Sequence, residues 1–189
     1  MIVSLDEARR ERAAARPSAP ATQLRSAPRD EAAYAAGILS LDDAMQACVL
    51  GALAAADFRR LLQTVTEDWP AELGAAAVTL TLKSHDEAHR FERGGTAALS
   101  ARKVQRWHEA ATAPELRAVH GDHPLFAEGS GVRTAAVVPV TLPEPLGAGL
   151  LAIGMREGGA LEALGGAERL GFLGAALSRM LGVCLTRSF

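Results

Sequence analysis

The sequence predicts an α+β fold in which helices flank a central antiparallel sheet of about five to six strands. Residues 131–140 and 149–156 are two apolar runs bounded by Pro and Gly. A strand with one solvated face would alternate polar and apolar residues, so both runs are expected to be buried on both faces. A long apolar helical pattern closes the chain, from Leu170 to Leu185. Helices must therefore cover both sides of the sheet.

Length and composition limit the function classes. At 189 residues the chain suffices for one domain and a tail. The formal net charge of -2 gives no reason to expect nucleic acid or an anionic membrane as a partner. Acidic residues at the start, and the lack of a long uninterrupted apolar run, predict no signal peptide and no membrane span. Cys48 and Cys184 lie in apolar helical patterns, which indicates buried thiols in a reducing compartment. We expect a cytoplasmic protein with no cofactor.

The first 30 residues are predicted to lie outside the domain. Ser4 and Glu7 form a capping box for a short helix through about Arg16. Residues 17–30 contain three prolines and little apolar surface, which predicts a flexible linker. The sequence thus predicts a tail at 1–30 and a domain at 31–189.

Two helices should open the domain. Apolar residues recur at helical spacing after Ser40, from Leu41 to Leu53. A second helix is expected to start after Asp57 and to end at Pro70.

The middle of the chain predicts further strands. Residues 75–82 alternate apolar residues with Thr79 and Thr81, which predicts a half-buried strand. A weaker strand is expected through Phe91, a helix over 96–110, a short strand over 115–119 and a turn over 121–124.

Several segments in this order are similar to those of a known bacterial family. They are Leu125-Phe126, Gly131-Val132-Arg133-Thr134-Ala135-Ala136-Val137, Gly149-Leu150-Leu151-Ala152-Ile153-Gly154-Met155-Arg156, Gly171-Phe172-Leu173 and Leu177-Ser178-Arg179. Together they resemble the GAF-like family labelled domain of unknown function 484, over roughly residues 40–187. The resemblance implies a GAF-like fold and no enzyme activity to transfer.

That resemblance implies a sensory or signalling module that dimerises, with a small molecule as the candidate ligand. The alternative is a ligand-free adaptor whose partner is another protein, for example a tyrosine recombinase, because the family's genes often lie beside one. An enzyme of unknown class ranks third. A sensor should have a closed cavity between the sheet and residues 94–126, whereas an adaptor should have that space filled.

Arg133 is the first candidate ligand-binding residue, with Thr134 beside it. A guanidinium among Val132, Ala135 and Val137 is expected to be buried, so it must meet a carboxylate, carbonyls or an anionic ligand. Replacing Arg133 by Met is then expected to cost on the order of 3 kcal/mol. His85 and His89 have the spacing of metal ligands on a helix, but a solvated hairpin is the preferred interpretation, so no metal site is predicted.

The predicted homodimer rests on apolar residues outside the core stripes of the first and last helices. These candidate interface residues are Leu50, Phe172, Ala176 and Val183. A sheet covers only one side of each helix, so a second copy would cover the rest through a two-fold axis.

Overall fold

The structure is a computed structural model, and it describes residues 41–120, 122–142, 144, 147–157 and 166–187. Contacts within the chain divide it into two units, Met1–Ala36 and Gly37–Phe189, and all of the described residues belong to the second unit. The predicted short helix, the linker at 1–30 and the domain start at residue 31 lie outside the described residues.

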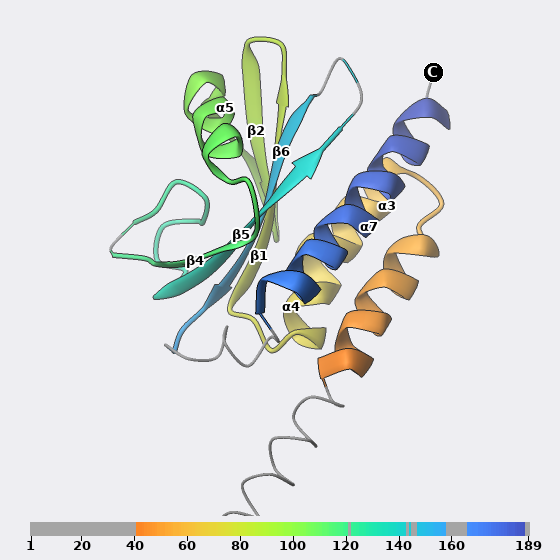
Figure 1. Cartoon of the computed structure of the whole chain (residues 1–189), viewed down its shortest axis with the longest axis horizontal. Helices are drawn as coiled ribbons and strands as arrows, with labels where there is room; N and C mark the ends of the chain where they lie inside the picture. Colours follow the sequence, from red (N-terminus) through yellow and green to blue (C-terminus); the bar gives the residue numbers. More distant parts are fainter. Residues whose placement is uncertain (1–40, 121, 143, 145–146, 158–165, 188–189) are drawn as a thin grey trace, which may run out of the picture. The chain divides into compact units, whose positions relative to one another are not determined.

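A six-stranded antiparallel sheet forms the centre of the domain (Figure 1). Its order is β3-β2-β1-β6-β5-β4. The strands are β1 (Ala77–Ser84), β2 (Glu87–Glu92), β3 (Gly95–Ser100), β4 (Glu115–Ala118), β5 (Thr134–Thr141) and β6 (Ala148–Met155). Every residue of β6 is buried, as expected for a central strand covered on both faces. The predicted fold class, α+β with about five to six strands, is confirmed.

One face of the sheet is covered by a helical layer. This layer contains a helix over residues 41–53, the short helices α3 (Phe58–Gln63) and α4 (Trp69–Glu72) joined by a π-helical turn, η1 (Thr64–Asp68), and the long helix α7 (Gly166–Arg187). Figure 1 shows these helices together on one side of the strands. The largest hydrophobic cluster lies between them and the sheet, and includes Leu61, Trp69, Leu80 and Leu177.

The opposite face is covered by α5 (Ala101–Ala110) and by an irregular segment, residues 122–132, which we call the strap. A second cluster of buried side chains fills this layer. Its members are Ala88, Val104, Val119, Leu125, Phe126, Val132, Ala135, Val137, Leu150 and Ala152. The domain thus has two hydrophobic layers, one on each side of the sheet.

Two predicted elements differ from the observed ones. Residues 96–100 were expected to be helical, but they belong to β3, which pairs with β2 from Gly95 to Ser100. The helix begins only at Ala101. The helix after Asp57 was expected to end at Pro70, but it continues through α4 to Glu72. Pro70 lies in the first turn of α4, directly after the π-helical turn η1, and such an irregular turn accommodates a proline that lacks the N–H of a regular helix.

Helix α7 is by length and composition long and apolar enough to cross a membrane over Gly166–Thr186. Its regularly spaced residues Leu170, Leu173, Leu177 and Leu181 are, however, each at most 1% exposed within the core. A core helix of a globular domain has the same composition, and these leucines form such a core face, while Phe172 and Val183 of α7 are exposed.

Candidate functional site

The layer beneath α5 and the strap contains the polar side chains that lie deepest in the domain. Thr79 and Thr81 lie on the face of β1 opposite Val78 and Leu80, since side chains alternate along a strand. They are only 1% and 0% exposed. The half-buried strand predicted from the sequence is therefore wrong for β1, because α5 and the strap cover the threonine face as well.

Arg90 is the buried charge of this layer. It lies directly across from Thr81 in the β1–β2 ladder and is 8% exposed. Its Nη1 donates to the carbonyl oxygens of Pro124 and Phe126, each at 2.7 Å, and its Nη2 contacts Glu92 Oε1 at 2.8 Å. An ion pair buried to this degree stays charged only because carbonyls and a carboxylate replace water.

The strap is thus bonded to the sheet at three successive carbonyl groups. Besides the two bonds from Arg90, the Thr79 hydroxyl donates to the carbonyl of Leu125 at 2.7 Å. The side chains of Leu125 and Phe126 are 2% and 3% exposed, so they fill the space above the sheet. The closed cavity expected of a sensor is occupied here by side chains of the strap itself.

Gly154 of β6 lets the strap approach the sheet closely. A Cβ at this position would meet Val132 Cγ2 at 2.5 Å and Phe126 Cε1 at 2.8 Å. Real Cβ atoms essentially never come within 3.0 Å of another heavy atom, so any other residue would push the strap outward.

Three buried polar atoms of this layer have no hydrogen-bond partner among the described residues. They are Thr81 Oγ1, Arg90 Nε and His108 Nε2. Thr81 and Arg90 share the sheet face that α5 covers, and His108 lies one helical turn beyond the buried Val104 on α5. An unpaired buried polar group costs about 1–3 kcal/mol, so each of these atoms calls for a partner such as a bound water molecule or a ligand. We call these three the orphan atoms.

An aromatic group closes the outer side of the same layer. The ring of His123 in the strap stacks on Trp107 of α5, with centroids 6.0 Å apart, and lies 6.4 Å from Phe126. The Leu125 amide donates to His123 Nδ1 at 3.3 Å. Burial, and secondly the positive charge of Arg117, lower the pKa of His123. The ring is therefore held neutral, with Nδ1 as the acceptor.

Arg133 is not buried as the sequence predicted. Its side chain is exposed, and it precedes β5, which begins at Thr134 rather than at Gly131. Its backbone carries the contacts: the amide donates to Met155 O at 2.8 Å, and the carbonyl accepts from Val119 N at 2.7 Å. The prediction of a buried guanidinium was wrong because the apolar neighbours in sequence point away from Arg133 into the core.

Thr134 is partly buried, and its hydroxyl donates to the Glu157 carbonyl at 3.1 Å. Arg133 lines an open hollow of about 620 Å³ together with His120 and Asp122, whereas Thr134 does not line it. The structure therefore does not bring the two predicted ligand-binding residues into one closed site.

The predicted interface residues lie on the helical layer. Leu50, Phe172 and Val183 are 55%, 60% and 49% exposed. Ala176 is partly buried and packs against the larger core cluster. Leu53, which is 62% exposed, adds to the apolar surface of the first helix.

The remaining sequence candidates have structural explanations. His85 and Asp86 form the turn of the β1–β2 hairpin, as expected, and His85 has a positive φ of 51°. Among the described residues, no three His, Cys, Asp or Glu side chains are grouped so as to hold a metal ion. Cys48 and Cys184 are both buried. Burial, and secondly Glu72, raise the pKa of Cys48 to about 12.

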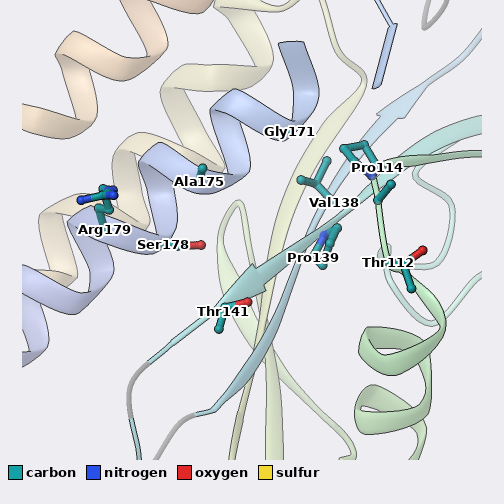
Figure 2. Close-up of a pocket in the computed structure, with 10 residues that line it drawn as sticks. Thr112, Pro114, Val138, Pro139, Thr141, Gly171, Ala175, Ser178 and Arg179 are labelled. Atoms are coloured by element: carbon teal, nitrogen blue, oxygen red, sulfur yellow. The ribbon is translucent and has the colours of Figure 1, made fainter. Parts of the chain in front are cut away.

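A separate open groove of about 530 Å³ runs between α7, β5 and residues 112–114 (Figure 2). Figure 2 shows Thr112 and Pro114 on one side and Ser178 and Arg179 of α7 on the other. Val138 and Pro139 of β5 also line it. The groove lies where β4 no longer covers the edge of β5, since β4 pairs only with Thr134–Val137.

Comparison with solved structures agrees with the arrangement of a six-stranded sheet between two helical layers. The domain is similar to the A. aeolicus nlh2 GAF domain in an inactive state, with a TM-score of 0.57, 11% identity, and coverage of 77% of this chain and 97% of that one. It has the GAF fold. A GAF domain of a phosphoenolpyruvate-protein phosphotransferase from Coxiella burnetii matches with a TM-score of 0.52, 14% identity, and coverage of 80% and 95%.

The chromophore-binding domain of the Stigmatella aurantiaca bacteriophytochrome also matches, with a TM-score of 0.54 and 14% identity. The match covers 76% of this chain and 60% of that chain. No family model and no curated protein match the sequence. The GAF-like fold implied by the resemblance is thus confirmed, whereas membership of the family labelled domain of unknown function 484 stays a prediction.

Sequence reasoning missed Thr81, Arg90 and His108. Arg90 lies between His89 and Phe91 in a short strand of mixed polarity, Glu87–Glu92, and this local pattern does not indicate that a charged side chain is buried. The alternation of Thr79 and Thr81 was visible, but the sequence did not show that a second layer covers that side. The available signal for this site was the pair of threonines at alternate positions of β1, which places both on one face of the sheet.

Proposed function

We propose that this protein is a non-enzymatic, cytoplasmic GAF-like sensory or regulatory module that dimerises and binds a small molecule between its sheet and the strap. The three orphan atoms carry the proposal. Thr81 and Arg90 supply hydrogen-bond donors, and His108 supplies a donor or an acceptor, all within a layer shielded from water. A ligand with a carboxylate or another acceptor group would satisfy Arg90 and Thr81 together.

The fold supports this proposal only by analogy. The similar structures include domains named for sensory proteins, such as the bacteriophytochromes. Because one fold supports many functions, the side chains of this chain must carry the argument. The relevant fact is that Thr81 and Arg90, which carry two of the orphan atoms, lie directly opposite each other on one face of the sheet, the face that α5 with His108 covers.

The ligand hypothesis is tested with Thr81→Val, in which a methyl group replaces the orphan hydroxyl. The free protein should become more stable by about 1 kcal/mol, because a buried unpaired polar group is removed. A ligand retained by the purified wild type in native mass spectrometry should be lost from the variant. The matched control is Thr79→Val, whose hydroxyl is paired with Leu125 and whose loss should therefore destabilise the domain.

A destabilised Thr81→Val would contradict the proposal, because Thr81 Oγ1 would then have a partner in the free protein. If native mass spectrometry finds no retained molecule, thermal shifts against a library of small carboxylates provide the second measurement. The absence of any shift there would favour the ligand-free adaptor. That alternative has the packing of Leu125 and Phe126 into the layer in its favour.

The dimer is proposed from the exposed apolar side chains of the helical layer. Leu50 and Phe172 are more than half exposed, and Val183 is nearly so. Large apolar residues exposed on neighbouring helices mark a contact surface more often than single ones do. A two-fold axis would let the same surface cover itself.

Light scattering after size exclusion tests this assembly at micromolar concentration. The wild type should have the mass of a dimer, and Phe172→Glu and Val183→Glu should produce folded monomers. Ala127→Glu is the matched control, because Ala127 is exposed on the strap, which covers the opposite face of the sheet. A monomeric wild type would refute the dimer.

A further inference from the structure

We propose that Arg90 is a latch that holds the strap closed over the orphan atoms, and that its release is the step that opens this layer to a ligand. The role as a gate rests on the function proposed above. The latch itself does not, because it concerns contacts within the free domain.

The contacts of Arg90 connect the strap to a rigid part of the sheet. Strand β2 pairs with β1 on one side and with β3 on the other. One guanidinium nitrogen of Arg90 bonds two strap carbonyls that are two residues apart, those of Pro124 and Phe126. Glu92 pairs with the other terminal nitrogen and orients the guanidinium group of Arg90. A single side chain thus fixes the conformation of the strap where it crosses the sheet.

Leu125, Phe126 and Val132 of the strap pack in the core, whereas its middle part lies at the surface and contains glycines in the left-handed region. Ala127, Glu128 and Gly129 are exposed. Gly129 and Gly131 have positive φ values of 73° and 70°, which glycine adopts without strain. Beyond the latch, Thr79 supplies the one other side-chain bond from the sheet that the structure gives, to the carbonyl of Leu125.

The geometry also explains why the latch leaves Arg90 Nε unpaired. Both terminal nitrogens are committed to the strap and to Glu92, whereas Nε is buried and has no hydrogen-bond partner among the described residues. An incoming oxyanion can accept from Nε–H and compete with the strap carbonyls for the guanidinium. Binding and opening would then be coupled through one side chain.

Hydrogen–deuterium exchange of the full-length, ligand-free protein tests the latch. In Arg90→Met, amides of residues 122–132 should exchange about tenfold faster or more, because two charge-assisted bonds are lost. Amides of the β5–β6 ladder should keep their wild-type rates. Arg102→Met is the matched control, since Arg102 is an exposed arginine at the start of α5, and it should leave the exchange of the strap unchanged.

A second variant keeps the test decisive if Arg90→Met fails to fold. Thr79→Val removes the remaining side-chain bond to the strap while preserving volume, and it should also accelerate exchange confined to residues 122–132. Unchanged exchange in the strap, or equal acceleration across the whole sheet, in the folded variant would overturn the latch. If exchange of the strap accelerates in these variants but no ligand is found for the wild type, the latch is supported and only the proposed function is contradicted.

Discussion

Two glycines of α7, three residues apart, allow the packing of this helix on the sheet to be measured directly. A Cβ at Gly171 would meet Pro114 Cγ at 3.6 Å, an ordinary van der Waals distance. A Cβ at Gly174 would overlap Val138 Cγ1, well inside the 3.0 Å that real Cβ atoms keep. Gly171→Ala and Gly174→Ala should therefore gain the same stability from helix propensity but differ in the cost of steric overlap.

The magnitudes follow from these two contributions. Alanine is more favourable than glycine in a helix interior by about 1 kcal/mol, so Gly171→Ala should stabilise the domain by up to that amount. Overpacking a filled core costs about 1–3 kcal/mol. Val138 is 1% exposed and β-branched, so its side chain is restricted in χ1 and adjusts only at a cost. Gly174→Ala should consequently be less stable than Gly171→Ala by about 1–3 kcal/mol.

Urea denaturation monitored by circular dichroism measures the difference, with equal slopes required for the comparison. The two substitutions have the same chemistry and lie on the same helix, so effects on the unfolded chain largely cancel. Equal unfolding free energies for the two variants would refute the reasoning. They would show that α7 does not lie against Val138 as closely as the structure has it.

Three further predictions follow from single residues. Arg133→Met should change the unfolding free energy by no more than about 0.5 kcal/mol, because the side chain is exposed, and a urea midpoint much below that of the wild type would contradict this. Cys48, with its pKa raised to about 12, should resist thiol reagents until urea unfolds the domain, and rapid labelling of the native protein would contradict its burial. Because the pKa of His123 is lowered from 6.5, the unfolded state takes up the proton first as the pH falls, so stability should decline from about pH 6.5 downward. His123→Gln should remove that part of the decline, as urea midpoints near neutral pH and at about pH 5.5 would show.

The elements with strong apolar periodicity were predictable from the sequence. Strand β6 and helix α7 are long, almost wholly apolar on the buried side, and bounded by glycines, so their type follows from local pattern. Strand β3 was not predictable in this way. It is a short edge strand with a mostly exposed, mixed sequence, and its pairing with β2 alone decides its conformation.

The two arginines show why the site was missed. Arg133 stands in a mostly apolar segment and is exposed, whereas Arg90 stands in a strand of mixed polarity and is buried. Burial depends on what crosses over a residue, and the strap that covers Arg90 lies more than 30 residues further along the chain. Local composition therefore indicated the wrong arginine.

The distribution of polarity between the two layers is the strongest argument that the strap side has a use beyond stability. The helical side of β1 carries Val78, Leu80 and Leu82, and β6 carries Leu151 and Ile153 there, a purely apolar surface. The strap side of the sheet carries Thr79, Thr81 and Arg90, which are also buried. Thr79 and Arg90 satisfy strap carbonyls, but the unpaired hydroxyl of Thr81, like each of the orphan atoms, costs about 1–3 kcal/mol that an apolar group would avoid. A domain that is stable by about 5–15 kcal/mol in total bears a substantial cost in keeping them. A ligand that pairs with the orphan atoms would recover this cost, and Thr81→Val measures it directly.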